Sequence, residues 1–126
     1  MLNQSSQSAE LHAGLVVDTR DLVIEKPRFG AFYGTDLDVI LQERGIESII
    51  ISGISSDICC DTTAREANAR DLPVFFLSDG TATAGPNPTE VQMRTLNLMG
   101  ALFAQVLTID EMVHKITGSA DGDGAP

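Results

Sequence analysis

The sequence predicts an α/β fold, a Rossmann-like open parallel sheet with helices on both faces. Short runs of β-branched and apolar residues alternate along the chain with segments of helical period, and no internal repeat interrupts this order. Such alternation is typical of βαβ units. With 126 residues, 43% of them hydrophobic, the chain has enough apolar material for one domain and is too short for two.

The first half of the chain contains two predicted strands around one helix. The run Leu22 to Ile24 is a short strand that must end before Pro27, because proline cannot continue a central strand. Thr35 can cap an amphipathic helix, and Gly45 is suited to the C′ position just after the end of that helix. The run Ile46 to Ser52 is almost entirely apolar, as expected for a parallel strand covered on both faces.

The middle of the chain predicts a helix followed by a strand. Ser55, Ser56 or Asp57 can cap an Ala-rich helix that reaches about Arg70. The run Pro73 to Leu77 is the next buried strand, and Ser78-Asp79-Gly80 predicts a turn at its carboxyl end.

The last part predicts a helix, a strand and a short helix. Thr89 with Gln92, and Thr108 with Glu111, have the spacing of capping boxes. They predict helices to about Gly100 and to about Ile116, on either side of a strand at 103–107. The predicted order is β-α-β-α-β-α-β-α. We expect residues 1–13 to be irregular or disordered, 14–117 to form the domain and 118–126 to be a flexible tail.

Charge and cysteine content exclude several classes of function. A formal net charge of −10 argues against binding to nucleic acid or to an anionic membrane surface. The amino-terminal segment does not resemble a secretory signal, and no apolar stretch reaches the length of a membrane span. Cys59 and Cys60 are adjacent and fit disulfide geometry poorly, so we expect reduced thiols and a cytoplasmic location.

Three polar features follow predicted strands, namely Lys26, the segment 53–59 and Asp79. Ligands of open parallel sheets collect at the carboxyl ends of the strands, so we expect these features at one edge. A thiol near a helix start, with an ammonium nearby, is favoured as thiolate, which would make Cys59 with Lys26 an activated nucleophile. The alternative is that Cys59 simply packs in the core, as many cysteines do.

Two segments resemble the diagnostic motifs of the isochorismatase-like cysteine hydrolases. K-P-R-F-G-A-F-Y-G-T-D-L at 26–37 resembles the lysine segment of that family, and G-I-S-S-D-I-C-C-D-T-T-A-R-E-A at 53–67 resembles its nucleophile segment. The resemblance extends from about residue 10 to residue 116. It implies a three-layer fold in which Cys59 is the nucleophile and Lys26 the catalytic lysine.

The resemblance also implies how a substrate would be held. It implies a cis peptide bond between Ile54 and Ser55, with the backbone N–H groups of Ser55 and Cys59 forming an oxyanion hole. Cys60 stands where the family usually has valine, which favours packing. Asp57 either orients this loop or caps the helix. Four side chains could border the pocket: Arg28, Phe29, Phe32 and Tyr33. The alternative is core packing for the three aromatic residues and a solvated surface position for Arg28.

The family's catalytic aspartate belongs to a first strand that has no counterpart ahead of Leu22. The segment around Asp18 superficially resembles that strand, but by alignment Asp18 belongs to the stretch that leads into Lys26. The family's metal ligands belong to the same region, so we predict no metal and no other cofactor. The chain therefore resembles the C-terminal two-thirds of a family member, which would leave the strand at 46–52 with an open edge.

These observations predict a hydrolase that cleaves a small amide or related carbonyl compound, with a nicotinamidase as one form of it. The alternative is a catalytically impaired fragment or homologue that acts as an assembly or interaction module. The expected partners are a small-molecule substrate and further copies of the chain in a dimer or tetramer, with neither nucleic acid nor membrane. A thiol redox protein is disfavoured because the adjacent cysteines lack the C-x-x-C spacing.

Overall fold

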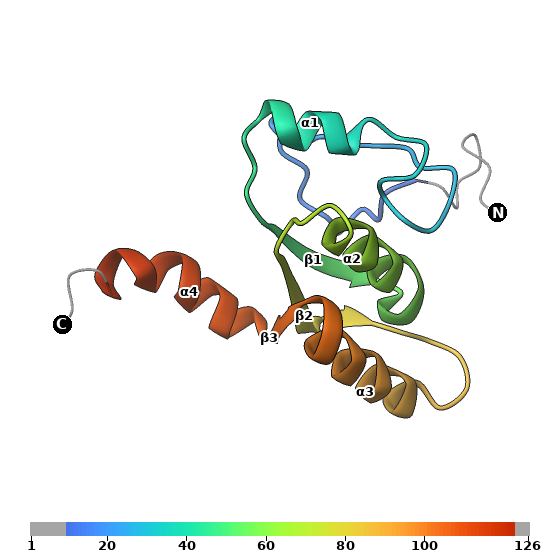
Figure 1. The fold of residues 1–126 in the computed structure, drawn as a ribbon. Helices are drawn as coiled ribbons and strands as arrows, with labels where there is room; N and C mark the ends of the chain where they lie inside the picture. Colours follow the sequence, from blue (N-terminus) through green and yellow to red (C-terminus); the bar gives the residue numbers. More distant parts are fainter. Residues whose placement is uncertain (1–9, 123–126) are drawn as a thin grey trace.

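The structure is a computed structural model that describes residues 10–122. Within this range, the regular elements begin at Leu37, and helices alternate with three strands (Figure 1). The elements are α1 Leu37–Glu43, β1 Ile49–Ile54, the π-helical turn η2 Ser56–Cys60, α2 Asp61–Asn68, β2 Val74–Ala82, α3 Pro88–Leu98, the π-helical turn η3 Met99–Phe103, β3 Gln105–Leu107 and α4 Ile109–Gly122.

The three strands form a parallel sheet in the order β1-β2-β3. Ile49 pairs with Val74, and Phe75 pairs with Gln105, so the strands advance across the sheet in chain order. Their connections contain helices, as parallel pairing requires. The predicted α/β class and the open parallel sheet are therefore confirmed.

Alternate side chains of β2 build the two sides of the core. Val74 and Phe76 pack with Ala64 and Ala67 of α2 and with Met99 of η3. On the opposite face, Leu77 packs with Leu107 and with Met112 of α4. Because successive side chains of a strand point to opposite faces, one strand contacts helices on both sides. The helices α2 and α3 lie together in front of the sheet, whereas α4 leaves the body on its other side (Figure 1).

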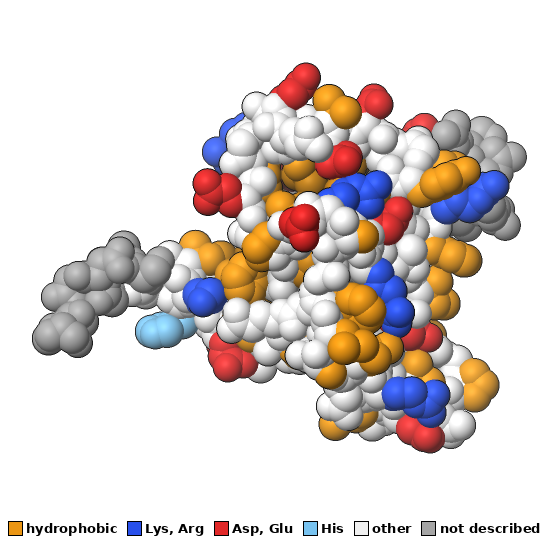
Figure 2. Space-filling view, in the orientation of Figure 1, with side chains coloured by type: hydrophobic (Ala, Val, Ile, Leu, Met, Phe, Trp, Pro, Cys, Tyr) orange, Lys and Arg blue, Asp and Glu red, His pale blue; other side chains and the backbone are white. Residues whose placement is uncertain are grey.

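Parts of the helices remain uncovered. In the space-filling view, apolar side chains are exposed over α3 and η3 and where α4 joins the body (Figure 2). Leu102 of η3, Met93 of α3 and Val113 of α4 are all more than half exposed. The described residues therefore leave an apolar surface open at two places.

The predicted strand at Leu22 to Ile24 is wrong. Residues 10–36 form turns, bends and extended coil without a helix or a strand. A strand needs a neighbour for its backbone hydrogen bonds, and within residues 10–122 the strand β1 pairs only with β2. Leu22 and Val23 remain exposed instead of entering a sheet.

The strand β2 is longer than predicted. It continues to Ala82, through the residues Ser78-Asp79-Gly80 that predicted a turn. The pairing with β1 remains possible because the register shifts between Ile51 and Gly53 of β1, after which Gly53 pairs with Thr81. An irregularity of this kind lets a strand continue where an even register would not.

The predicted helix ends are partly confirmed. Thr108 and Glu111 form a reciprocal capping box, with Thr108 N donating to Glu111 Oε1 over 2.8 Å and Glu111 N donating to Thr108 Oγ1 over 3.1 Å. The helix α4 then continues to Gly122, past the predicted end at Ile116. The predicted tail 118–126 is thus helical in its first five residues. Its remainder, like residues 1–9, lies outside the described part.

The capping box predicted for α3 is wrong. The residue before this helix is Asn87, which has φ = 54°, and Pro88 occupies the first helical position. Proline suits that position because its missing N–H would find no partner inside the helix. The side chain of Gln92 instead donates to Ser78 O and Thr81 O, both at 3.3 Å, and so ties α3 to β2.

Candidate active site

The end of β1 and the turn η2 position Cys59. The strand β1 ends at Ile54, and the carbonyl of Ser55 accepts hydrogen bonds from the N–H groups of Ile58 and Cys60 at 3.2 and 3.1 Å. Cys60 is buried in the core, which leaves its neighbour Cys59 half-buried at the start of the helical segment. The strand end and the buried neighbour therefore fix the place of the Cys59 thiol.

The loop before η2 has the backbone that the resemblance implied, with a cis peptide bond between Ile54 and Ser55. It is attached to the end of β2 by Thr83, whose hydroxyl donates to Asp57 Oδ1 over 2.6 Å. Of the two roles considered for Asp57, the structure favours orientation of the loop, because the η2 start shows no side-chain cap.

Lys26 reaches the cysteine from the irregular segment. Its Nζ donates to the carbonyl oxygens of Arg28 at 3.0 Å and Phe29 at 2.8 Å, and it lies 3.8 Å from Cys59 Sγ. The ammonium is thereby held by two carbonyl groups of its own loop while it faces the sulfur. The structure brings together the two residues that the sequence predicted to form a reactive pair.

A groove of about 390 Å³ lies beside this pair. Lys26 and Cys59 stand among its lining residues, together with consecutive residues of β1 and with Leu37 and Leu41 of α1. The lining is mostly apolar and contains no carboxylate. A small neutral molecule could thus occupy the groove next to the thiol.

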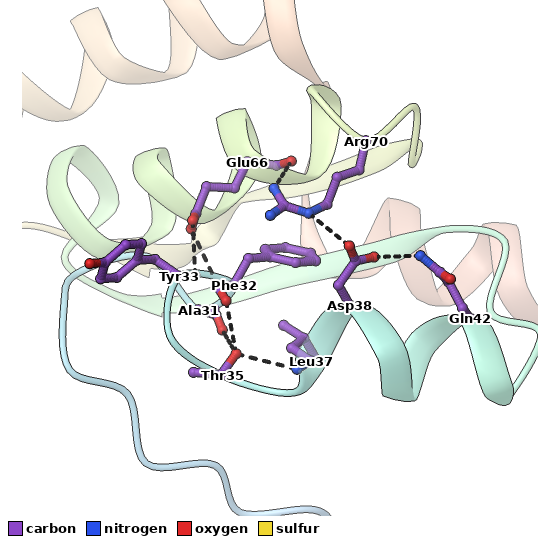
Figure 3. Close-up of polar contacts among 9 residues, drawn as sticks. All are labelled: Ala31, Phe32, Tyr33, Thr35, Leu37, Asp38, Gln42, Glu66 and Arg70. Atoms are coloured by element: carbon purple, nitrogen blue, oxygen red, sulfur yellow. Dashed lines mark hydrogen bonds and ion pairs between the residues drawn. The ribbon is translucent and has the colours of Figure 1, made fainter.

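The loop that follows Lys26 is held by α2. Ala31 N donates to Thr63 Oγ1 at 3.1 Å, and Phe32 N and Tyr33 N donate to the two carboxylate oxygens of Glu66 at 3.4 and 3.1 Å. In the close-up, Glu66 points from α2 toward the backbone of this loop (Figure 3).

Sequence reasoning did not single out Thr63 and Glu66, although a signal was present. Cys59, Thr63, Glu66 and Arg70 follow one another at spacings of four, three and four residues. These spacings place them on one face of a helix.

The four side chains considered for a pocket border are not among those that line the groove. Phe32 is 3% exposed and packs in the main core, where the guanidinium of Arg70 lies 4.5 Å from its ring centroid. Tyr33 and Phe29 are exposed by 61% and 62%. Arg28 donates from Nη1 to Pro27 O at 2.8 Å. The position of Phe32 corresponds to the packing role that the sequence left open for it.

Two aspartates are engaged elsewhere. Asp79 lies within β2, and its Oδ1 accepts from Ile109 N at 2.7 Å, so it serves the start of α4. The expectation that Asp79 joins Lys26 and Cys59 is not supported by this contact. Asp18 accepts hydrogen bonds from the side chain and the backbone of Arg20, and the side-chain bond is the main cause of its lowered pKa.

The two cysteines differ in their surroundings. Burial raises the pKa of the Cys60 thiol to about 11, and the neighbouring Cys59 adds to the effect, whereas Lys26 acts in the opposite direction. A thiol with so high a pKa is almost entirely protonated at neutral pH and is a poor nucleophile. The half-buried Cys59, which faces the Lys26 ammonium, is the candidate nucleophile of the pair.

Among residues 10–122, no three His, Cys, Asp or Glu side chains cluster in a way that could hold a metal ion. The helices in the same range are also too short or too polar to cross a membrane.

Comparison with known proteins identifies the family. Residues 1–111 match the family model of the isochorismatase domain. The chain belongs to the isochorismatase family. The curated members to which it is similar include nicotinamidase 3 of Arabidopsis thaliana, with 33% identity over 79% of this chain and 48% of that protein. The ureidoacrylate amidohydrolase of Methylobacterium radiotolerans is 34% identical over the whole chain and 45% of its own length.

Solved structures that are similar to this chain have the same fold. The cysteine hydrolase of Pseudomonas syringae pv. phaseolicola 1448A superposes with a TM-score of 0.87 at 28% identity, over 91% of this chain and 58% of that one. The chain spans less than half the length of the two curated relatives named above. The matched part nevertheless includes both the lysine segment and the nucleophile segment, because it reaches residue 111.

Proposed function

We propose that this chain carries the nucleophile of an amide hydrolase of the isochorismatase family, with the Cys59 thiolate attacking a small carbonyl compound. The observation that carries the proposal is the 3.8 Å approach of Lys26 Nζ to Cys59 Sγ beside a groove of small-molecule size. An ammonium at this distance favours the thiolate, which is the reactive form of cysteine.

The reaction follows from the chemistry of a thiolate and an amide. The sulfur bonds to the carbonyl carbon, and the backbone N–H groups of Ser55 and Cys59 are the proposed donors to the resulting oxyanion. The C–N bond then breaks, the nitrogen leaves with a proton, and a thioester remains. Water hydrolyses the thioester and returns the thiol. The groove lining contains no carboxylate that could carry these protons. In this mechanism the proton carrier is therefore a group outside the groove lining.

The substrate class is a small amide or ureido compound. The curated relatives carry names of enzymes that act on such compounds, a nicotinamidase and a ureidoacrylate amidohydrolase. The groove lining is mostly apolar but includes the Lys26 ammonium, so it suits a neutral amide and can also accept a ureido acid. A panel of small primary amides and ureido acids, with ammonia release as the readout, tests this proposal on the full 126-residue chain.

The decisive comparison is between the wild-type chain and Cys59→Ala. We expect ammonia release from at least one panel compound by the wild-type chain and none by the variant. A matched Cys60→Ala chain should retain activity, because Cys60 packs in the core. Equal turnover by the Cys59→Ala and wild-type chains would exclude the mechanism.

A second candidate function is a non-catalytic module that associates through its sheet. Two observations favour it: the groove lining lacks a carboxylate, and one edge of β1 is unpaired within residues 10–122. Iodoacetamide separates the two functions at neutral pH. A Cys59 that reacts no faster than a free model thiol would favour the module, whereas faster reaction favours the enzyme.

A further inference from the structure

One face of α2 connects the cysteine with the loop that carries the lysine. Cys59 lies just ahead of α2, and Thr63 and Glu66 follow on the same face. Thr63 accepts from the N–H of Ala31, and Glu66 accepts from the next two N–H groups of the loop, those of Phe32 and Tyr33. The helix that presents the thiol therefore also holds the loop.

The same loop supplies the two oxygens that hold the lysine. Lys26 Nζ binds the carbonyls of Arg28 and Phe29, which directly precede Gly30 in the chain. Gly30 is buried against Glu66, so close that an added Cβ would collide with the carboxylate and with Thr62. Glu66 binds the backbone at residues 32 and 33, and Lys26 binds the backbone at residues 28 and 29. Only a few residues of one loop therefore separate the two sets of hydrogen bonds.

Glu66 is itself held in place. Arg70, in the turn that follows α2, donates from Nη1 to the backbone carbonyl oxygen of Glu66 at 2.9 Å, stacks on the ring of Phe32 and pairs with Asp38 of α1 at 3.3 Å. Figure 3 shows Arg70 between Glu66 and Asp38, above Phe32. Because Glu66 offers two charged oxygens to two neighbouring N–H groups, its hydrogen bonds are of the stronger, charge-assisted kind.

We infer that Glu66 is a positioning residue for the reactive pair: its carboxylate fixes the loop 30–33 and thereby keeps the Lys26 ammonium against Cys59. This inference rests on the proposed function, since it concerns the activation of the same thiol. Glu66 is not among the residues that line the groove, and its carboxylate accepts from the backbone of the loop. Its effect on Cys59 must therefore pass through the loop and Lys26.

The test measures iodoacetamide alkylation of Cys59 at pH 7 and at pH 10 in the full chain. Cys59 and Cys60 are distinguished by tandem mass spectrometry of the peptide that contains both. At pH 10 most accessible thiols are ionised without help, so a loss of lysine assistance lowers the rate at pH 7 and hardly affects the rate at pH 10. A general loosening of the fold would instead expose Cys60 as well and raise labelling at both pH values.

The variants are Glu66→Ala, Glu66→Gln, Lys26→Met and the double variant of Glu66→Ala with Lys26→Met. The matched control is Glu90→Ala, which removes a helix glutamate that pairs with Arg94 on the surface of α3. We expect Lys26→Met to lower the pH 7 rate by about three- to tenfold, because the thiolate loses a nearby ammonium. Glu66→Ala should lower it toward the same value, because the loop no longer keeps that ammonium against the sulfur. Glu66→Gln, which keeps one acceptor oxygen, should lie between them and the wild-type chain.

The double variant decides how Glu66 acts. If Glu66 works through Lys26, adding Glu66→Ala to Lys26→Met lowers the pH 7 rate no further. An additive loss, or an unchanged pH 7 rate in Glu66→Ala and Glu66→Gln, would overturn the inference. Should Glu66→Ala not fold, Glu66→Gln and Thr63→Val, which removes the acceptor for Ala31 N, supply the same comparison.

The outcomes separate this inference from the proposed function. If Lys26→Met reacts like the wild-type chain, the reactive pair itself is refuted. If Lys26→Met is slow while the Glu66 variants are as fast as Glu90→Ala, the pair stands and the positioning role of Glu66 is refuted.

Discussion

The ammonium nitrogen of Lys26 lies 3.8 Å from the sulfur of Cys59, although the two residues are 33 positions apart in the sequence. Lys26 belongs to an irregular segment and Cys59 to the turn that follows β1. The carbonyl oxygens of Arg28 and Phe29 accept hydrogen bonds from the same ammonium. The contact joins a loop to a helix start, and its consequences can be measured.

Salt should weaken the assistance that Lys26 gives to Cys59. Lys26 is exposed, and attraction between exposed charges is screened as ionic strength rises. We expect the alkylation rate of the wild-type chain by the neutral reagent iodoacetamide to fall about two- to fivefold between low salt and 1 M salt at pH 7. The rate of Lys26→Met should change little, and an equal salt effect in both chains would contradict the prediction.

Alkaline pH should destabilise the protein through Cys60. Its thiol has a pKa of about 11 in the folded chain, against an ordinary value of 9.0, chiefly because of burial. Unfolding therefore releases a proton between these values, so the contribution of Cys60 to stability is complete below pH 9 and is lost as the pH rises toward 11. Denaturant unfolding at pH 8, 9, 10 and 11 measures this loss.

The control for the alkaline effect is Cys60→Ala. This variant lacks the buried thiol and should show a shallower fall in the free energy of unfolding over the same pH range. Parallel curves for the wild-type chain and Cys60→Ala would assign the alkaline loss to other groups.

Gly30→Ala should disturb the loop that Glu66 holds. The added methyl group would collide with the Glu66 carboxylate and lie 2.9 Å from Thr62 Cγ2. Overpacking of this kind costs about 1–3 kcal/mol of unfolding free energy. Gly100→Ala, where the methyl group meets Val106 at 3.4 Å, is the matched substitution and should change stability less. Denaturant unfolding curves compare the two, and equal stabilities would argue against the tight contact.

Asp79→Ala should weaken the start of α4 and leave the thiol untouched. The Asp79 carboxylate accepts the N–H of Ile109, so its removal resembles the loss of a helix cap, about 1 kcal/mol. Circular dichroism and unfolding report the loss, and iodoacetamide labelling of Cys59 at pH 7 should match that of the wild-type chain. Slower labelling of Cys59 would indicate that Asp79 does influence the thiol.

Much of the fold could be predicted because it depends on local patterns. The apolar run at 46–52, the Ala-rich segment after Cys59 and the Thr108–Glu111 pair each contain most of the information for their element. The positions of β1, α2 and α4 accordingly agree with the prediction to within a few residues at their starts or centres. The helix C-terminus at Gly45 is confirmed by its φ of 63°.

The failures share a different cause. Leu22 to Ile24 has the composition of a strand, but within the described residues no neighbouring strand supplies its hydrogen bonds. Ser78-Asp79-Gly80 has the composition of a turn, but pairing with β1 beyond an irregular register keeps it in β2. Gln92 could close a capping box, yet the carbonyls of β2 bind its side chain.

By itself the sequence determined the α/β class, the parallel order of elements, the family motifs and the two residues of the proposed reactive pair. Those features are local, because periodicity, caps and motif spacing act over a few neighbouring residues. The tertiary structure alone decided that the Lys26 ammonium lies against the Cys59 sulfur, and that Glu66 holds the loop that follows Lys26. Such contacts join segments more than 30 residues apart, and only the packing of α2 against the loop brings their atoms within hydrogen-bonding distance.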